Sequence, residues 1–318
     1  MFDFDVAGIG LNATDTVILV PHFPAYAGKV AFDEEMLSPG GQVASAMVTC
    51  SRLGLRAKYI GTVGDDERGR IQLRSLESTG INLDDVRVRK NTPNQTAYIV
   101  IDRTTGERTV FWNRAEGLRL QPEEIDARMI TRARLLHIDG HDTEAAEKAA
   151  KLAREAGMPV TVDVDTIYPG FEGVLKHVTH LVASSEFPVA WTKEKDPLRA
   201  LDLIQREYRI PVAAMTLGSH GALAKVNGQV YYSPAFVVNC VDTTGAGDVF
   251  HGAFCYAVLE GMPMADALDF SNAMAALNCR ALGARGGIGS ASEAYALMGR
   301  AERRLHPDFA RAGVTTSA

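Results

Sequence analysis

The sequence lacks the apolar run of about 20 residues that a membrane-spanning helix needs. Its N-terminus, MFDFDVAGIG, has neither the basic start nor the apolar core of a secretion signal. An excess of one charge is also missing, because 33 Lys and Arg stand against 39 Asp and Glu, giving a formal net charge of −6. We therefore expect a cytoplasmic protein with no membrane segment and no basic surface for nucleic acid.

Cysteine is scarce, and no two cysteines form a C-x-x-C pair. Most of them lie in apolar or helix-like surroundings, which favours reduced, buried thiols over disulfides. The positions are Cys50, Cys240, Cys255 and Cys279.

The sequence has no phosphate-binding loop of the G-x-x-x-x-G-K-[ST] type, and its one match to a dinucleotide-binding loop lacks the helix that such a site needs. No G-x-x-x-x-G-K-[ST] sequence occurs, so phosphate chemistry would need another cradle. Residues 8–13, GIGLNA, fit the G-x-G-x-x-A pattern, but a dinucleotide site needs a helix to open at these glycines. The following TDTVILVPHFP has β-branched residues, prolines and no helical period. We expect a glycine-lined bend at the mouth of a sheet instead.

At 318 residues and 46% hydrophobic composition, the chain can bury a large core. Short apolar runs alternate with amphipathic segments, several of which end at glycine, as helices often do. This alternation predicts an α/β fold with a mainly parallel sheet and helices on both faces. The expected strands are Asp5–Gly10, Ala57–Val63, Leu135–Asp139, Val160–Asp163, His180–Ala183 and Val212–Leu217. The expected helices are Gln42–Leu53, Arg68–Thr79, Thr143–Ala156, Pro197–Tyr208, Asp248–Glu260 and Met264–Leu282.

Two segments break this alternation and predict a small antiparallel sheet that projects from the α/β body. Thr14–Phe32 is β-branched and punctuated by prolines, and Ala97–Asn113 has the pattern of a hairpin around Thr105-Gly106. We expect one domain over residues 1–302, with lid segments at about 14–38 and 92–115. Residues 303–318 are polar and predict a tail that frays.

Residues 137–142, HIDGHD, have the residue types of a zinc or iron site. His137 and Asp139 would share one face of a strand, but no second cluster of similar density completes a closed site. We therefore expect these side chains, like Asp163 and Asp165 in VTVDVD, to end parallel strands, where ligands gather in such sheets. A structural metal is the alternative.

The most informative stretch is VDTTGAGDVFHGAF, residues 241–254. Its glycines allow a tight turn, after which an apolar, helix-like run begins near Asp248. A helix N-terminus offers free N–H groups and positive potential, which together bind anions. Such a cradle could hold a transferring phosphoryl group while Asp248, kept ionised there, accepts a proton from a substrate hydroxyl. A helix cap is the simpler alternative, but a cap does not require these glycines.

This stretch resembles the C-terminal signature D-T-x-G-A-G-D of the ribokinase-like (PfkB) carbohydrate kinases and matches it at every position. Residues 38–69 resemble the family's N-terminal signature, and the resemblance, closest to ketohexokinase- and fructokinase-type members, extends to about residue 290. It implies a three-layer α/β sandwich with a lid that closes over the sugar and often mediates homodimers. The implied activity is phosphorylation of a sugar, at a primary CH₂OH, with ATP and Mg²⁺.

The resemblance also assigns roles to individual residues. It implies Asp248 as the catalytic base and the amides of Gly245, Ala246 and Gly247 as the anion hole. The implied sugar-binding residues are Asn12, Asp15, Gly40, Gly41, Gln42 and Ser45, the last two in place of family asparagines. The implied nucleotide-binding residues are Thr216, Gly218, Gly221, Asn272, Arg114 and Glu186. Asp242 and Thr244 match positions that hold a monovalent cation such as K⁺ in some members.

Other functions remain open at this stage. A nucleoside kinase of the same fold would need an aromatic slot, for which Phe23, Tyr26 and Trp112 are candidates. A phosphorylated or sulfonated sugar would need basic residues, and the candidates are Arg103, Arg108 and Arg114. A sugar-sensing protein without catalysis is the alternative from another class.

Overall fold

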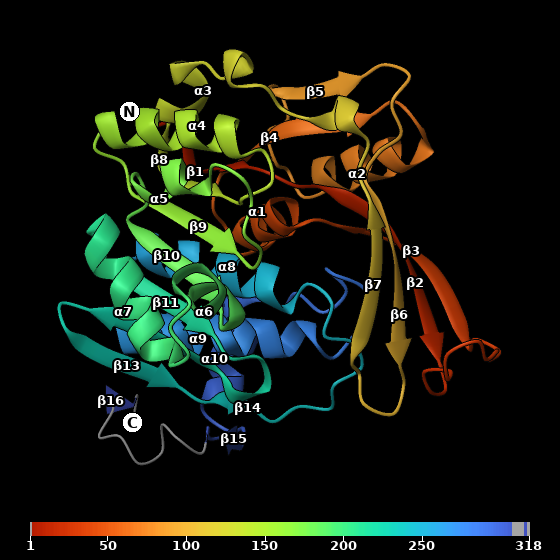
Figure 1. Ribbon diagram of the computed structural model, residues 1–318. Coiled ribbons are helices and arrows are strands. Elements are labelled where there is room, and N and C mark those ends of the chain that lie inside the picture. Colours follow the sequence, from red (N-terminus) through yellow and green to blue (C-terminus); the bar gives the residue numbers. More distant parts are fainter. Residues whose placement is uncertain (1, 307–314, 317–318) are drawn as a thin grey trace.

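The middle layer of the computed structural model is a ten-stranded sheet, in the order β16-β13-β12-β11-β10-β9-β8-β1-β4-β5. The structure describes residues 2–306 and 315–316 (Figure 1). From β11 to β5 all neighbouring strands are parallel, whereas β12 is antiparallel to both β11 and β13. The strands are β1 Phe4–Ile9, β4 Ala57–Gly64, β5 Val86–Arg89, β8 Ala133–Ile138, β9 Val160–Val164, β10 His180–Ser184, β11 Val212–Thr216, β12 Ala222–Val226, β13 Gln229–Ser233 and β16 Thr315–Thr316.

Helices cover both faces of this sheet, because successive strand side chains point to opposite faces and both sets are apolar. In β1, for example, Val6 belongs to one buried cluster, whereas Ala7 and Ile9 belong to the other. One layer contains α1 Gln42–Arg52, α2 Glu67–Glu77, α8 Ala246–Leu259, α9 Met264–Asn278 and α10 Ala291–Met298. The other contains α3 Ala127–Thr131, α4 Thr143–Glu155, α5 Phe171–Leu175, α6 Glu186–Thr192 and α7 Pro197–Tyr208. In the described part of the chain, none of these helices has the length and hydropathy to cross a bilayer.

A second sheet projects from the body as a lid (Figure 1). Its order is β3-β2-β6-β7, and its strands are β2 Ala13–Val20, β3 Glu34–Gly40, β6 Thr96–Asp102 and β7 Arg108–Asn113. The hairpins β2–β3 and β6–β7 are antiparallel, but β2 and β6 pair in parallel. The lid is thus a mixed sheet, whereas the sequence predicted a purely antiparallel one. Val17, Ala97, Ile99 and Ile101 are buried on its inner face.

The C-terminal segment departs from the predicted fraying tail. Arg303–Arg304 forms strand β15, which pairs with β14, Ala235–Phe236. The Arg303 guanidinium lies 3.7 Å above the Phe236 ring and 2.7 Å from a carboxylate oxygen of Asp269. The ordered body therefore extends past residue 302. The rest of the predicted tail, residues 307–314 and 317–318, lies outside the described residues.

Candidate active site

A cavity of about 770 Å³ lies between the lid and the carboxyl ends of the parallel strands. The inner face of the lid contributes Ala97, Ile99, Val110 and Trp112, and the ends of β9 and β11 contribute Asp163 and Thr216. Parallel sheets bind ligands at this edge. Of the aromatic candidates for a base-binding slot, Trp112 lines the cavity, whereas Phe23 and Tyr26 are exposed elsewhere on the lid.

The glycine-rich turn forms one wall of the cavity, and α8 begins within it. Gly245 adopts a left-handed conformation (φ 73°), and a Cβ there would overlap the carbonyl oxygen of Ala284. Only glycine meets both conditions without strain. Gly245, Ala246, Gly247 and Asp248 all line the cavity, so the N-terminus of a 14-residue helix opens onto it. The free N–H groups and dipole of that helix form an anion site.

Asp248 lies in the first turn of α8 and faces the cavity. Burial, together with the nearby negative charge of Asp163, raises its pKa to about 6. Asp163 itself pairs with His251, one turn along α8, with 3.1 Å between Oδ1 and Nε2. The sequence predicted that the positive potential of the helix N-terminus keeps Asp248 ionised; burial acts against this, but a pKa near 6 still leaves the carboxyl mostly ionised at pH 7. It also makes Asp248 a stronger base than a solvated aspartate.

Asp15 in β2 is the second carboxylate at the cavity. Its Oδ1 accepts a hydrogen bond from the amide of Ala97 at 3.0 Å, while Gly40 leaves open the space beside Oδ2. Burial raises its pKa to about 7, and the negative charge of Asp248 adds to the rise. Gln95, which sequence reasoning missed, also lines the cavity, and its buried Oε1 has no hydrogen-bond partner. Together they present acceptors for the hydroxyl groups of a ligand.

The predicted Gly40-Gly41 turn leads from the lid into α1. Gly41 (φ 93°) and Gln42 line the cavity, whereas Ser45 is fully buried behind them. Ser45 accepts a hydrogen bond from Nε of Arg285 at 3.1 Å. Arg285 also donates to the carbonyl of Gly40 at 2.7 Å. The sequence analysis did not predict a role for this buried arginine, whose hydrogen bonds to Ser45 and Gly40 hold the turn in place.

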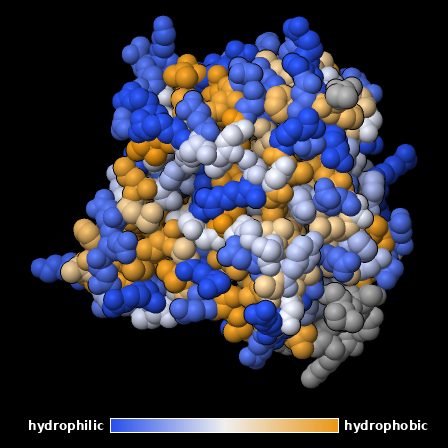
Figure 2. All heavy atoms as spheres, turned by 180° about the vertical axis from the view of Figure 1, so that it is seen from behind, coloured by the Kyte–Doolittle hydropathy of each residue, from blue (hydrophilic) through white to orange (hydrophobic). Residues whose placement is uncertain are grey.

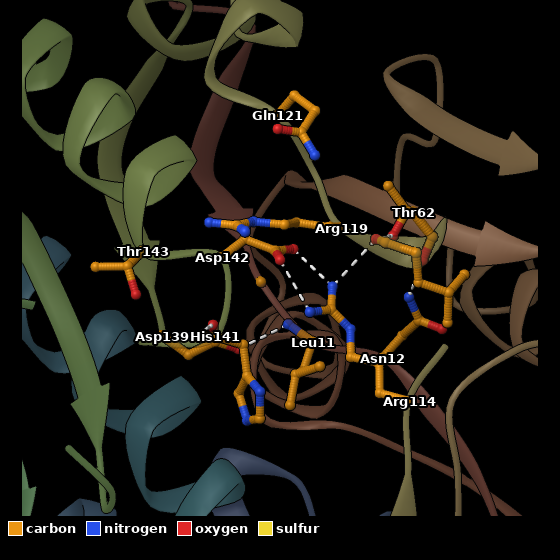
Figure 3. A network of polar contacts seen from close by, with 12 residues as sticks. Leu11, Asn12, Thr62, Arg114, Arg119, Gln121, Asp139, His141, Asp142 and Thr143 are labelled. Atoms are coloured by element: carbon orange, nitrogen blue, oxygen red, sulfur yellow. Dashed lines mark hydrogen bonds and ion pairs between the residues drawn. The ribbon is translucent and has the colours of Figure 1, made fainter. Parts of the chain in front are cut away.

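Asn12 does not line the cavity. Its Nδ2 donates to the carbonyl of Thr62 at 2.6 Å (Figure 3). The same Nδ2 donates to the Tyr59 hydroxyl at 2.9 Å. Asn12 therefore braces the bend between β1 and β2. No helix opens at this bend, as the sequence predicted when it disfavoured a dinucleotide site.

At the other end of the cavity, α9 presents Asn272, Ala275, Ala276 and Cys279 on one face. The Nδ2 of Asn272 donates to the carbonyl and hydroxyl oxygens of Ser233, at 3.0 and 2.7 Å. The predicted nucleotide residues Thr216 and Gly218 line the same end. Gly221 does not, but its positive φ of 97° and its close approach to Ser233 shape the turn behind them.

Two further predicted nucleotide residues lie away from this cavity. Arg114 lines a neighbouring cavity of about 390 Å³, where it forms two hydrogen bonds with the carboxylate of Asp142, at 2.9 and 2.7 Å (Figure 3). Glu186 is exposed in the first turn of α6 and lines neither cavity. Of the three arginine candidates, Arg108 in the lid reaches the main cavity, and it donates to the hydroxyl of Thr243 at 2.8 Å. Arg103 pairs with Asp33 at 3.1 Å instead.

Asp242 and Thr244, predicted for a monovalent cation, are buried beside the glycine-rich turn. Asp242 accepts hydrogen bonds from the amides of Thr244 and Gly283, at 2.7 and 2.8 Å. The hydroxyl of Thr244 is buried without a partner. The alternative metal cluster fails, because no group of three or more His, Cys, Asp or Glu among residues 2–306 and 315–316 is placed to hold an ion. Asp139 instead accepts from the amides of Leu11 and His141.

A lid-covered cavity with a helix N-terminus and a buried carboxylate at one corner is the arrangement of a small-molecule kinase. Comparison with known proteins agrees: residues 5–290 match the pfkB family carbohydrate kinases. The chain therefore belongs to this family of sugar kinases.

Individual relatives carry several sugar specificities. The chain is 30% identical to the ATP-dependent ribose-1-phosphate kinase of Halopiger xanaduensis, covering 85% of this chain and 90% of the relative. It is 26% identical to the ribokinase of Bacillus subtilis, covering 92% and 99%. A solved structure from Agrobacterium tumefaciens, of a protein proposed to be a ribokinase, superposes with a TM-score of 0.86 at 29% identity, covering 93% of this chain and 97% of that one. The fold is thus ribokinase-like.

Proposed function

We propose that this protein transfers the γ-phosphoryl group of ATP to a hydroxyl, most simply a primary CH₂OH, of a small sugar. One observation carries the proposal: Asp248, the N-terminus of α8 and Asp15 all face a single lid-covered cavity. The sugar would lie against Asp15, Gln95 and Gly41, with Gln42 beside it. The triphosphate would extend toward Thr216, Gly218 and Asn272.

Each group then has a role in the transfer. Asp248 accepts the proton of the attacking hydroxyl, and the amides of residues 245–247 stabilise the charge that develops on the phosphoryl oxygens. The lid excludes water, which would otherwise compete for the phosphoryl group. Arg108 closes the lid onto the turn through Thr243.

Mg²⁺, when bound with ATP, would supply positive charge to the phosphates. Asp165 directly follows β9 and lines the cavity, and its carboxylate offers the hard oxygen atoms that Mg²⁺ prefers. Burial raises the pKa of this carboxyl in the free protein. In this proposal, Asp165 replaces Glu186, which the resemblance assigned to nucleotide binding but which lines neither cavity. A monovalent cation such as K⁺ beside Asp242 and Thr244 stays a prediction, and the free hydroxyl of Thr244 supports it.

The test is a substrate panel. Purified protein is incubated with MgATP and ketoses, aldoses, sugar acids, sugar phosphates or nucleosides, and ADP release is measured. A sugar that releases ADP well above the no-sugar control supports the proposal. Turnover confined to nucleosides would replace it with a nucleoside kinase, and sugar binding without ADP release would replace it with a sugar sensor. Because the reaction consumes ATP, we also propose a cytoplasmic location.

We further propose a homodimer formed through the outer face of the lid. One row across its strands carries Leu37, Thr16, Tyr98 and Phe111 in register. Leu37, Tyr98 and Phe111 are 49%, 50% and 59% exposed. Hydrophobic side chains gather on this projecting side of the molecule (Figure 2). Light scattering of the wild type and of Phe111→Glu tests it: a dimer that becomes a monomer supports the proposal, and a wild-type monomer contradicts it.

A further inference from the structure

The end of the main cavity that the proposed function assigns to ATP is bounded in part by a segment outside the family match. Residues 302–306, which we call the C-terminal strap, follow α10, whereas the match to the family ends at residue 290. Arg304 of the strap lines the cavity together with Ala235 and Asn272. The sequence predicted no role for this arginine, because it lies in the segment expected to fray.

The strap is fixed to the body by backbone and side-chain contacts. Its strand β15 pairs with β14. The Arg303 guanidinium forms two hydrogen bonds with the carboxylate of Asp269, at 3.1 and 2.7 Å. At the end of the strap, the amide of His306 donates to the Tyr232 hydroxyl at 2.8 Å. Arg304, between these two anchors, therefore has a defined position at the cavity.

The strand pairing determines the side to which Arg304 projects. Arg304 lies directly opposite Ala235, and Arg303 lies opposite Phe236. Residues directly opposite each other share a face of the sheet, and successive residues project to opposite faces. Arg303 projects onto α9, where it meets Asp269. Arg304 therefore projects the other way, onto the face where Ala235 lines the cavity.

The guanidinium of Arg304 is open to a ligand. Its side chain is exposed, and within residues 2–306 and 315–316 no group forms a hydrogen bond or ion pair with the guanidinium. The other arginine that lines this cavity in the described part of the chain, Arg108, already donates to Thr243. Arg304 thus offers the cavity a planar cation with five unused N–H donors.

The wall of the cavity beside Arg304 is apolar, as a nucleobase site requires. It is formed by residues of α9 and by β14 with the two residues that follow it: Ala235, Phe236, Val237, Val238, Ala275 and Ala276. The donors for the phosphates are instead the amides of the glycine-rich turn. A guanidinium beside an apolar wall can stack on the face of a base or donate to its ring nitrogens.

We propose that Arg304 binds the nucleobase of the phosphoryl donor, so that the C-terminal strap forms part of the nucleotide site. This inference rests on the proposed function, which places ATP at this end of the cavity. Because the groups that act in the transfer lie at the glycine-rich turn, Arg304 contributes to the affinity for the donor and leaves the transfer step unchanged.

The experiment compares the full-length wild type with Arg304→Ala. The variant is expected to raise the KM for ATP and the Kd for ADP about fivefold, while kcat at saturating ATP and the KM for the sugar keep their wild-type values. Inorganic triphosphate, which has the phosphates of ATP but no base, should inhibit both proteins equally. Arg300→Ala removes the same charge from an exposed position outside both cavities, so this matched control should keep the wild-type KM for ATP.

Two results would overturn the inference. Wild-type values of both the KM for ATP and the Kd for ADP in Arg304→Ala would mean that the guanidinium does not bind the nucleotide. Equal weakening of ATP and of inorganic triphosphate would assign Arg304 to the phosphates and not to the base. Failure of the proposed function is visible in a separate measurement, because the wild type would then release no ADP with any sugar.

Discussion

The guanidinium of Arg285 and the carboxylate of Asp248 interact electrostatically beneath the cavity. Burial raises the pKa of Asp248 to about 6, and the positive charge of Arg285 restrains that rise. In return, burial lowers the pKa of Arg285 to about 10, and Asp248 opposes the fall. Arg285 also restrains the pKa of Asp15, which burial raises to about 7. Arg285 thus favours the ionised form of both carboxylates, although other groups, among them His251 and Arg108 at Asp248, contribute more.

The role of Asp248 as general base leads to the first prediction. Asp248→Asn removes the proton acceptor without changing its shape, so turnover should fall by roughly 10²–10⁴-fold while ATP affinity changes little. Steady-state ADP release and equilibrium ATP binding measure the two quantities. Asp266→Asn, an exposed acid in the first turn of α9, is the control and should turn over as wild type does. Near-wild-type turnover of Asp248→Asn would remove the base from the mechanism.

The pH profile should follow the same carboxylate. Because the base must be deprotonated, kcat/KM should be low in acid and rise to a plateau as the pH passes about 6, the pKa of Asp248. Arg285→Met removes one of the positive charges that favour the ionised form of Asp248, so this rise should move to higher pH. Arg285→Lys keeps the charge but loses the three hydrogen-bond directions of the guanidinium. It should restore the profile while leaving KM for the sugar raised.

A profile of Arg285→Met that coincides with wild type would mean that Arg285 only holds the Gly40-Gly41 turn. Because a merely structural loss lowers activity at every pH, the position of the rise separates the two roles.

Gln95 gives a prediction in which stability and binding move in opposite directions. Its Oε1 is buried without a partner, so Gln95→Leu should leave the free energy of unfolding unchanged or raise it by about 1 kcal/mol. The same change removes an acceptor for a sugar hydroxyl and should raise KM about fivefold. Urea unfolding and sugar kinetics measure the pair. A variant that is destabilised with unchanged KM would make Gln95 a structural residue.

Much of the body could be predicted from the sequence, because its signals are local. The predicted helices begin within two residues of those observed, and Pro197–Tyr208 agrees at both ends. The predicted helix from Met264 continued to Leu282, whereas α9 ends at Asn278. The β12–β13 hairpin was missed although Asn227-Gly228 marks it, both residues having positive φ.

The remaining features depend on contacts between distant residues. Arg285 donates a hydrogen bond to the carbonyl of Gly40, which is 245 positions away in the sequence. No local pattern in the sequence around either residue indicates that contact. Arg114 was assigned to phosphate by resemblance, but Asp142 occupies its guanidinium. Similarly, the β6–β7 hairpin around Thr105-Gly106 was predicted from the sequence, while the parallel pairing of β6 with β2 is set by tertiary packing.

The last prediction concerns the glycine at the start of α8. Gly245 and Gly261 both have positive φ, 73° and 68°, but only at Gly245 would a Cβ overlap the backbone, at Ala284. Gly261→Ala should therefore cost about 1 kcal/mol of unfolding free energy, from the backbone conformation alone, and leave turnover intact. Gly245→Ala should cost about 2 kcal/mol or more, since the turn must also shift. Because that shift moves the amides and Asp248 away from the reacting atoms, turnover should fall about 10²-fold. Urea unfolding and ADP release compare the two variants, and equal losses of turnover would mean that the position of the turn does not govern the transfer.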